Sequence, residues 1–211
     1  HNNDRNGRGS YTDATRGTKY EGEFKGNMMS GVGLLLSPDG SRYEGQFQNN
    51  VRSGIGKMNY SDGSTYEGPF SMDREHGEHA KRVWASGEEY KGEFKQGLRE
   101  GFGTTTYANG DSYSGGWRTD KRSGKGTMYW REGAGFRYIG FWENGIQCGK
   151  GNLTEGAGDD SASYYGQFLR GKPHGKGQKK FADGSVYEGE WVGGLREGQG
   201  VYHYFVPAEH G

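Results

Sequence analysis

Two short stretches of the chain have residue types that could support catalysis or nucleotide binding. Gly124-Lys125-Gly126-Thr127 has the glycines and lysine of a phosphate cradle, but such a cradle sits between a strand and a helix and ends in Gly-Lys-Ser/Thr. Gly110-Asp111-Ser112 is superficially similar to a serine-hydrolase phrase, but no histidine and aspartate accompany it at a fixed spacing. Neither stretch predicts a catalytic centre.

A third stretch could bind a metal ion. His76, Glu78 and His79 offer nitrogen and oxygen ligands, but zinc needs four converging ligands. The single cysteine, Cys148, lies three repeats further along the pattern given below, roughly 30 Å away at the usual strand spacing. We therefore expect no metal and no cofactor, and we predict that the chain is not an enzyme.

The elements that would position all these residues belong to one repeated phrase, Tyr-x-Gly-x-aromatic. It occurs eight times, and successive tyrosines are 23 to 26 residues apart. A period of this length indicates a repeat architecture. The phrase begins at Tyr20, Tyr43, Tyr66, Tyr90, Tyr113, Tyr138, Tyr164 and Tyr187.

A second phrase, Gly-x-Gly, alternates with the first. After the third copy of the first phrase, the expected place has Gly77-Glu78-His79, without the second glycine. Because side chains alternate between the faces of a strand, both phrases predict short strands with one face of rings and glycines. Asn, Asp or Gly stands three residues after each closing aromatic residue, as at Asn27, and predicts a turn with positive φ.

The fold class that follows is all-β: an elongated, twisted antiparallel ribbon of about eight and a half stacked β-hairpins of 23 residues. Two strands per repeat give a length of roughly 80 Å. We expect residues 1–211 to form a single array. Residues 1–9 are similar to the second half of a repeat, so we also expect the chain to be a fragment of a longer array.

Composition narrows the function. The net charge is zero, with 27 basic and 27 acidic residues, which argues against a nucleic-acid partner. One cysteine allows no internal disulfide and favours a cytoplasmic protein. Hydrophobic residues make up only 29% of the chain, but 14% of its residues are aromatic, so rings must supply the buried area.

With these phrases in view, the chain resembles a MORN-repeat array (membrane occupation and recognition nexus). Residues 15–20, 27–33 and 142–151 are also similar to phrases in the MORN region of alsin-type exchange factors. The resemblance implies a scaffold or targeting module at membranes or in the cytoskeleton. It also implies attachment, in some members, to lipid kinases or GTPase exchange factors.

The ring residues have two interpretations. They could fill the core of the ribbon, or some could line a groove that binds a partner helix or extended peptide. The groove hypothesis gives a protein-interaction scaffold. Its candidate residues stand before short connections: Phe24, Phe47, Tyr60, Phe94, Tyr107, Trp117 and Trp130.

Basic residues near the turns support an alternative function, binding to anionic phospholipid such as phosphoinositide. The candidates are Arg52, Lys95, Arg99, Arg118, Lys121, Arg122, Lys172 and Lys176. Acidic residues such as Glu100 and Glu197 stand in equivalent turns, so a solvated face of mixed charge is the simpler interpretation. The open strands at the ribbon ends also suggest a homodimer.

Overall fold

The computed structural model describes residues 4–131, 135–158 and 161–206. Those residues form 18 β-strands and no helix, which confirms the all-β prediction. The chain consists of two compact units, unit 1 (residues 1–103) and unit 2 (residues 104–211). The division falls inside β10 (Leu98–Thr106).

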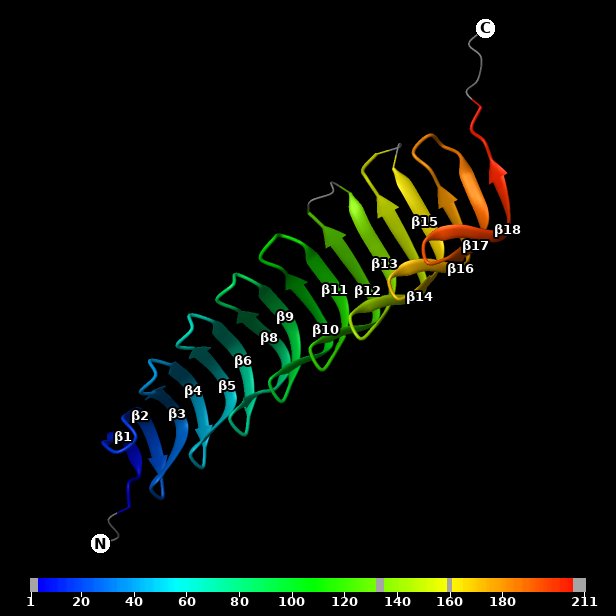
Figure 1. Cartoon of the computed structure of the whole chain (residues 1–211). Coiled ribbons are helices and arrows are strands. Elements are labelled where there is room, and N and C mark those ends of the chain that lie inside the picture. Colours follow the sequence, from blue (N-terminus) through cyan, green and yellow to red (C-terminus); the bar gives the residue numbers. More distant parts are fainter. Residues whose placement is uncertain (1–3, 132–134, 159–160, 207–211) are drawn as a thin grey trace. The chain divides into compact units, whose positions relative to one another are not determined.

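Within each unit, every hairpin pairs with the hairpins before and after it, and each pairing is antiparallel (Figure 1). Unit 1 contains β1 (Gly7–Asp13), β2 (Thr18–Lys25), β3 (Met28–Leu36), β4 (Arg42–Gln48), β5 (Val51–Asn59), β6 (Thr65–Ser71), β7 (Arg74–Glu75), β8 (Gly77–Val83), β9 (Glu89–Lys95) and most of β10. Unit 2 contains the end of β10, then β11 (Ser112–Arg118), β12 (Lys121–Trp130), β13 (Phe136–Glu143), β14 (Ile146–Glu155), β15 (Ala162–Leu169), β16 (Lys172–Lys180), β17 (Val186–Val192) and β18 (Leu195–His203).

Glycines from successive strands form a row across each unit, and Ala80 takes the place of one of them in unit 1. In unit 1, Gly22 pairs with Gly33, Gly33 with Gly45, and Gly45 with Gly56. The row leaves space for the tyrosine ring two residues earlier in the strand. A Cβ atom at Gly56 would lie 2.4 Å from the Tyr43 ring. The glycines are therefore needed so that each tyrosine can lie flat over two neighbouring strands.

The rings form a ladder on the same side of the sheet as the glycine row, which we call the aromatic face. Each tyrosine contacts the closing aromatic ring of its own repeat and that of the next repeat, as Tyr43 contacts Phe47 and Phe70. In both units these ladder pairs are edge-to-face, with centroids 5.0 to 5.4 Å apart. Such pairs contribute about 0.5–1.5 kcal/mol each beyond their buried area.

Six Gly-x-Gly strands, β3, β5, β12, β14, β16 and β18, bulge near the first glycine where they pair with the strand before them. Gly22 pairs with Gly33 but the next residue, Glu23, pairs with Ser30, so Gly31 and Val32 bulge out. Gly31 has a φ of 59°, a conformation that favours glycine. The Glu23 side chain accepts a hydrogen bond from the Val32 N–H at 3.2 Å. Gln46 and Glu93 accept equivalent bonds from Ile55 and Phe102.

The third repeat departs from this pattern. Gly77 pairs with Phe94, and Ala80 pairs with Gly92, so Ala80 occupies the place of the second glycine. Glu78 and His79 together fill the place of one residue, and His79 has a φ of 58°. This extra residue accounts for the 24-residue step from Tyr66 to Tyr90. The expected second-glycine position at residue 79 is thus corrected to Ala80.

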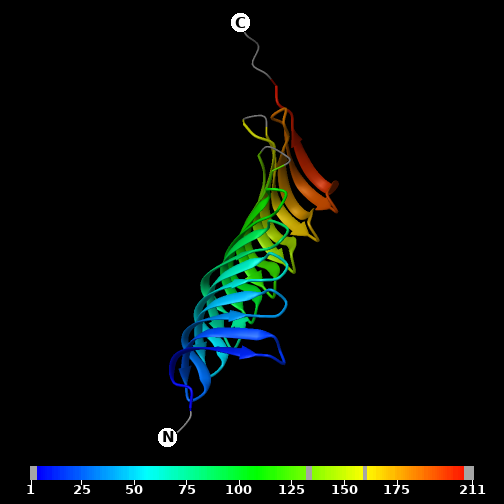
Figure 2. The same ribbon diagram turned by 90° about the vertical axis from the view of Figure 1, so that its left-hand side faces the viewer.

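The turns after the closing aromatic residues confirm the positive-φ prediction. Asn27, Asn50, Asp73, Gly97, Asp120, Gly145, Gly171 and Gly194 have φ values between 62° and 91°. Several of these residues also connect hairpins, because the turn N–H donates to a carbonyl of the preceding repeat, as Asn50 does to Met29 at 3.0 Å. Figure 2 shows the hairpins of each unit following one another with their turns along the edges.

Candidate functional site

Four of the seven predicted groove residues lie in the ring ladder. Phe24, Phe47, Phe94 and Trp117 are buried, with 3 to 7% of their surface exposed. Neighbouring rings cover them, because each closing ring packs edge-on against a tyrosine of its own repeat, as in the Tyr113–Trp117 pair. In the folded chain these four are core residues, and we place the candidate binding surface elsewhere.

The other three, Tyr60, Tyr107 and Trp130, are half-buried. Tyr60 and Tyr107 each begin an Asp-Gly or Asn-Gly turn, where their N–H groups donate to Ser64 and Asp111. Tyr60 is in unit 1, and Tyr107 and Trp130 are in unit 2. Their role in binding stays a prediction.

Tyr60 belongs to a buried charged cluster. Its hydroxyl donates to the carboxylate of Glu75 at 2.5 Å, and Arg82 donates to both oxygens of the same carboxylate, at 2.9 and 2.7 Å. The Glu75 side chain is 4% exposed. Burial raises the pKa of Glu75, while hydrogen bonds from Tyr60 and Arg82 and the charges of Arg82 and Arg52 act in the other direction. The cluster ties Tyr60 to Glu75 and Arg82 of the irregular third repeat, while the buried Nε of Arg82 has no hydrogen-bond partner among the described residues.

Three of the predicted lipid-binding cations also belong to the fold. Arg52, Arg99 and Arg122 are half-buried and stack on the aromatic face. The Arg122 guanidinium lies 4.2 Å from the centre of the Trp142 ring and donates to the Gly145 carbonyl at 2.8 Å. The sequence could have predicted this position. Each arginine stands two residues before the first glycine of Gly-x-Gly, so alternation along the strand places its side chain on the same face as that glycine.

The remaining predicted cations are exposed. Lys95, Arg118, Lys121 and Lys172 lie at the hairpin ends next to the turns that follow the closing aromatics, whereas Lys176 lies within β16. Lys95 is in unit 1 and the other four are in unit 2, where Arg118 and Lys121 line the same small hollow.

The opposite side of the sheet, which we call the open face, has the exposed apolar residues. Its side chains alternate with those of the aromatic face. In unit 1, Val32, Ile55 and Phe102, the middle residues of Gly-x-Gly, are 56, 60 and 60% exposed. In unit 2, Ile139, Phe141 and Tyr165 are 41 to 59% exposed. Sequence-based prediction from the rings of the repeated phrase misses this set, although alternation places it opposite those rings.

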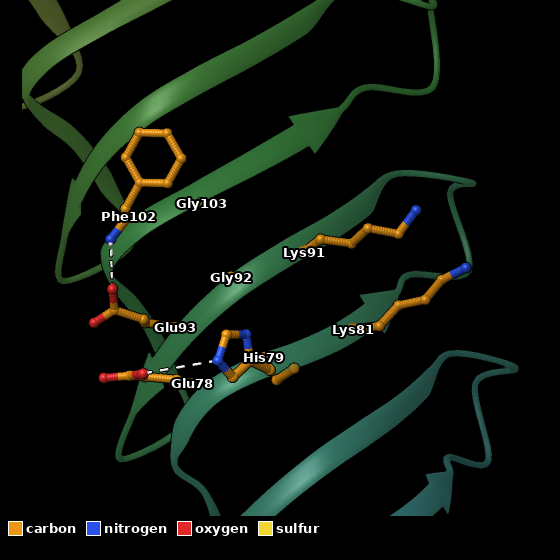
Figure 3. Close-up of a pocket in the computed structure, with 9 residues that line it drawn as sticks. Glu78, His79, Lys81, Lys91, Gly92, Glu93, Phe102 and Gly103 are labelled. Carbon is orange, nitrogen blue, oxygen red and sulfur yellow. Dashed lines mark hydrogen bonds and ion pairs between the residues drawn. The ribbon is translucent and has the colours of Figure 1, made fainter.

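A hollow lies on the open face of unit 1. Its volume is about 470 Å³, and Lys81, Lys91, Glu93, Phe102 and His79 are among its lining residues. Figure 3 shows these side chains on the neighbouring strands β8, β9 and β10, with Gly92 on the strand of Lys91 and Gly103 on the strand of Phe102. Lys81 and Lys91 both contact Glu89 in unit 1, at 2.8 Å each, and their hydrogen bonds lower the pKa of Glu89. The charges around this hollow therefore largely neutralise one another.

A larger hollow, of about 1130 Å³, lies on the open face of unit 2. The glycine row forms its floor. Its lining side chains include Lys150, Tyr165, Lys176, Gln178 and Glu188.

The described residues contain no cluster of three or more histidine, cysteine, aspartate or glutamate side chains that could hold a metal ion. His79 approaches Glu78 at 3.9 Å, with both side chains largely exposed. No helix in the described part of the chain has the length and apolar character needed to cross a bilayer.

Comparison with known proteins finds the MORN repeat at seven places. The matches cover residues 20–42, 43–65, 90–112, 113–135, 138–154, 164–186 and 187–205. Residues 66–89, the irregular third repeat with Ala80, are not among them.

Two curated relatives match a short part of the chain. Alsin from Rattus norvegicus is 51% identical over 41 residues, and alsin from Homo sapiens is 49% identical over 41 residues. The aligned region is 19% of this chain and 2% of each alsin.

Among solved structures, the chain is similar to the TCP10 domain of Danio rerio CPAP in complex with a peptide of Danio rerio STIL. The TM-score is 0.31 and the identity 9%, over 87% of this chain and 83% of that chain. The same domain without the peptide gives a TM-score of 0.29 at 12% identity, over 87% of this chain and 72% of that chain.

Proposed function

This chain belongs to the MORN repeat family, and from that premise we propose that it is a non-enzymatic scaffold that binds a protein partner across its open face. The partner segment is a helix or an extended peptide. One observation carries the proposal: large apolar side chains are exposed on the face that the core does not use. Phe102 and Tyr165 are 60 and 59% exposed.

The fold does not require apolar residues at these places. The middle position of Gly-x-Gly holds Phe102 and Ile55 in two repeats but Lys150 and Gln199 in others, and the strands form in all of them. An exposed ring that packing does not need is typical of an interaction surface. In unit 2, glycines of the row line the hollow of the open face, so a partner backbone can approach closely there.

Selection of peptides from a random displayed library tests the proposal. We expect enriched peptides to bind the unchanged chain and to lose most of their affinity for a Phe102→Ser/Tyr165→Ser variant. Met72→Ser is the matched control, because Met72 is 79% exposed at a turn. Enriched peptides that bind the double variant as tightly as the unchanged chain would show that the open face is not the site.

The second candidate function is binding to anionic phospholipid. It is favoured by the exposure of Lys95, Arg118, Lys121 and Lys172 at the hairpin ends. Each cation near an anionic surface contributes about 1 kcal/mol. Co-sedimentation with neutral and phosphoinositide-containing vesicles at two salt concentrations tests it: salt-sensitive binding to the anionic vesicles alone is expected, and no binding rejects it.

We also propose a homodimer through the outer strands β1 and β18, since unpaired strand edges can pair with another copy. Light scattering of the purified chain tests this, and a monomer mass at high concentration rejects it.

A cytoplasmic location, at a membrane or the cytoskeleton, stays a prediction that rests on the single cysteine and the family.

A further inference from the structure

Three exposed lysines occupy equivalent positions on the open face of unit 2. Lys125, Lys150 and Lys176 are the middle residues of Gly-x-Gly in β12, β14 and β16. We call them the lysine strip. Their cross-strand partners are Phe141, Gln167 and Glu190, so all three side chains lie on one face.

The strip is not neutralised in the way that the open face of unit 1 is. Among the described residues, no ion pair within 4.0 Å involves Lys125, Lys150 or Lys176. The Lys125 ammonium instead lies 5.7 Å from the centre of the Phe141 ring. Glu190 faces Lys176 across the strands, but its carboxylate reaches toward Gly198, where a Cβ atom would meet it.

The bulge geometry explains why no carboxylate accepts a hydrogen bond at the bulges of the strip. In unit 1, a glutamate on the neighbouring strand lies beside the bulge: Glu23 lies next to Val32, and Glu93 lies next to Phe102. At the equivalent place beside Lys125 stands Gly116, beside Lys150 stands Phe141, and beside Lys176 stands Gln167. The lysines therefore occur where no carboxylate lies beside the bulge. Glu188 and Glu190 also line the hollow of Lys150 and Lys176, but no ion pair ties either of them to a lysine of the strip in the described part of the chain.

The surroundings of the strip are hollowed and combine exposed apolar side chains with polar ones. Lys150 and Lys176 line the hollow of about 1130 Å³, together with Tyr165. Ile139 and Phe141 add exposed apolar surface, 45 and 41% exposed. A segment that enters a hollow can contact its floor and both lysines, whereas a flat bilayer surface cannot follow it inward.

The spacing of the lysines fits a helix. They lie on alternate strands, about 9.6 Å apart at the usual strand spacing. Seven residues of an α-helix rise about 10.5 Å and come back to nearly the same side of the helix. In an extended peptide a rise of about 10 Å separates residues i and i+3, whose side chains point to opposite sides, so they could not both face the lysines.

We propose that the lysine strip binds an acidic amphipathic helix of a partner protein. The helix lies across the strands with carboxylates at positions i, i+7 and i+14 and with apolar residues beside them against Tyr165 and Ile139. This inference rests on the proposed function and specifies the chemistry of its partner.

The test uses a fluorescent helical peptide with glutamates at i, i+7 and i+14 and leucines one turn away. A second peptide of the same sequence with lysine in place of those glutamates is its control. We expect the acidic peptide to bind the whole chain about tenfold or more tightly than the basic one, and to weaken as salt is added. Equal binding of the two peptides, or no binding of either, overturns the inference.

Charge reversal locates the site. In a Lys125→Glu/Lys150→Glu/Lys176→Glu variant, we expect acidic-peptide affinity to fall about tenfold or more. The matched control is Lys57→Glu, which changes an exposed lysine on the open face of unit 1. We expect the affinity of this variant for the acidic peptide to be unchanged. Equal losses in both chains refute the strip as the site. Because all four side chains are exposed, the melting temperatures should not change.

Two further outcomes separate this inference from the general one. If library peptides depend on Phe102 and Tyr165 but are not acidic, the proposed function stands and the lysine strip hypothesis fails. If the charge reversal abolishes binding to anionic vesicles while the acidic peptide does not bind, the strip recognises lipid and the inference is rejected.

Discussion

Substitution of Gly56 by alanine should destabilise the chain far more than a surface change of the same size. A Cβ atom there would lie 2.4 to 2.5 Å from three atoms of the Tyr43 ring. That ring is 1% exposed, contacts Phe47 and Phe70 edge-on, and donates a hydrogen bond to the Gln46 carbonyl at 2.9 Å. The alanine and the ring cannot both keep their places.

The size of the effect follows from what the displaced ring loses. Removal of a buried aromatic side chain costs about 3–5 kcal/mol, and the two ring pairs are worth about 0.5–1.5 kcal/mol each. A displaced ring loses most but not all of this, so we expect about 3 kcal/mol in the free energy of unfolding. Gly9→Ala is the matched control: Gly9 is in the same glycine row, opposite Gly22, but its Cβ atom would meet only Phe24 atoms at 3.9 Å or more.

Urea unfolding followed by circular dichroism measures the free energies, and hydrogen exchange in β4 and β5 shows whether the loss is local. The Gly9→Ala change should stay within about 0.5 kcal/mol. A double-mutant cycle gives the decisive comparison, because Gly56→Ala should cost little when Tyr43 is already alanine. If Gly56→Ala costs as little as Gly9→Ala, or costs the same with and without Tyr43, the ring-over-glycine explanation is refuted.

Three other perturbations have defined outcomes. Burial raises the pKa of Tyr43 and of Tyr113 from 10.0 to about 12, so between these pH values the unfolded state binds fewer protons than the folded one. The free energy of unfolding should therefore be fully present below pH 10 and should fall as the pH rises towards 12, by about 3 kcal/mol for each of the two tyrosines. Parallel titrations followed by tyrosinate absorbance and by circular dichroism check this prediction. Tyrosinate formation that is complete near pH 10 without unfolding would contradict it. Glu75→Ala leaves the Arg82 guanidinium and the Tyr60 hydroxyl without their shared acceptor and should lower the free energy of unfolding in urea by about 3 kcal/mol. The control Glu78→Ala changes an exposed side chain and should alter it by no more than about 0.5 kcal/mol. Equal costs would mean that the buried pairing contributes nothing. Arg122→Ala should lower stability by about 1–2 kcal/mol through its lost contacts with Trp142 and Gly145, and Lys121→Ala should not; a stable Arg122→Ala chain that loses vesicle binding would return Arg122 to the lipid-binding candidates.

The sequence predicted the strands, the turns and the shared face of rings because each depends on local rules repeated eight times. Alternation put Tyr43 and Phe47 on one face, and the residue three positions after each ring was suited to positive φ. The extent of ring burial was not predictable in the same way. It depends on contacts between successive repeats, such as Tyr43 with Phe70, that no single phrase contains.

The candidate site was harder to predict than the fold. Arg52 and Arg122 were grouped with turn cations because of their position in the chain, although alternation places them on the aromatic face with the glycines. The Glu75–Arg82 pairing depends on the extra residue in the third repeat, and sequence spacing gave no sign of it. Whether units 1 and 2 continue one another as a single array stays a prediction.

The glycine row also makes the sheet very thin along its centre. At Gly166 and Gly177 no side chain separates the floor of the open-face hollow from the Tyr164 ring, whose atoms lie within 2.7 Å of where a Cβ atom would stand. A ligand in the hollow therefore lies one backbone thickness from the ladder that contains Trp191. The chain's own tyrosine and tryptophan emission is thus a built-in optical reporter of binding, and no attached dye is needed.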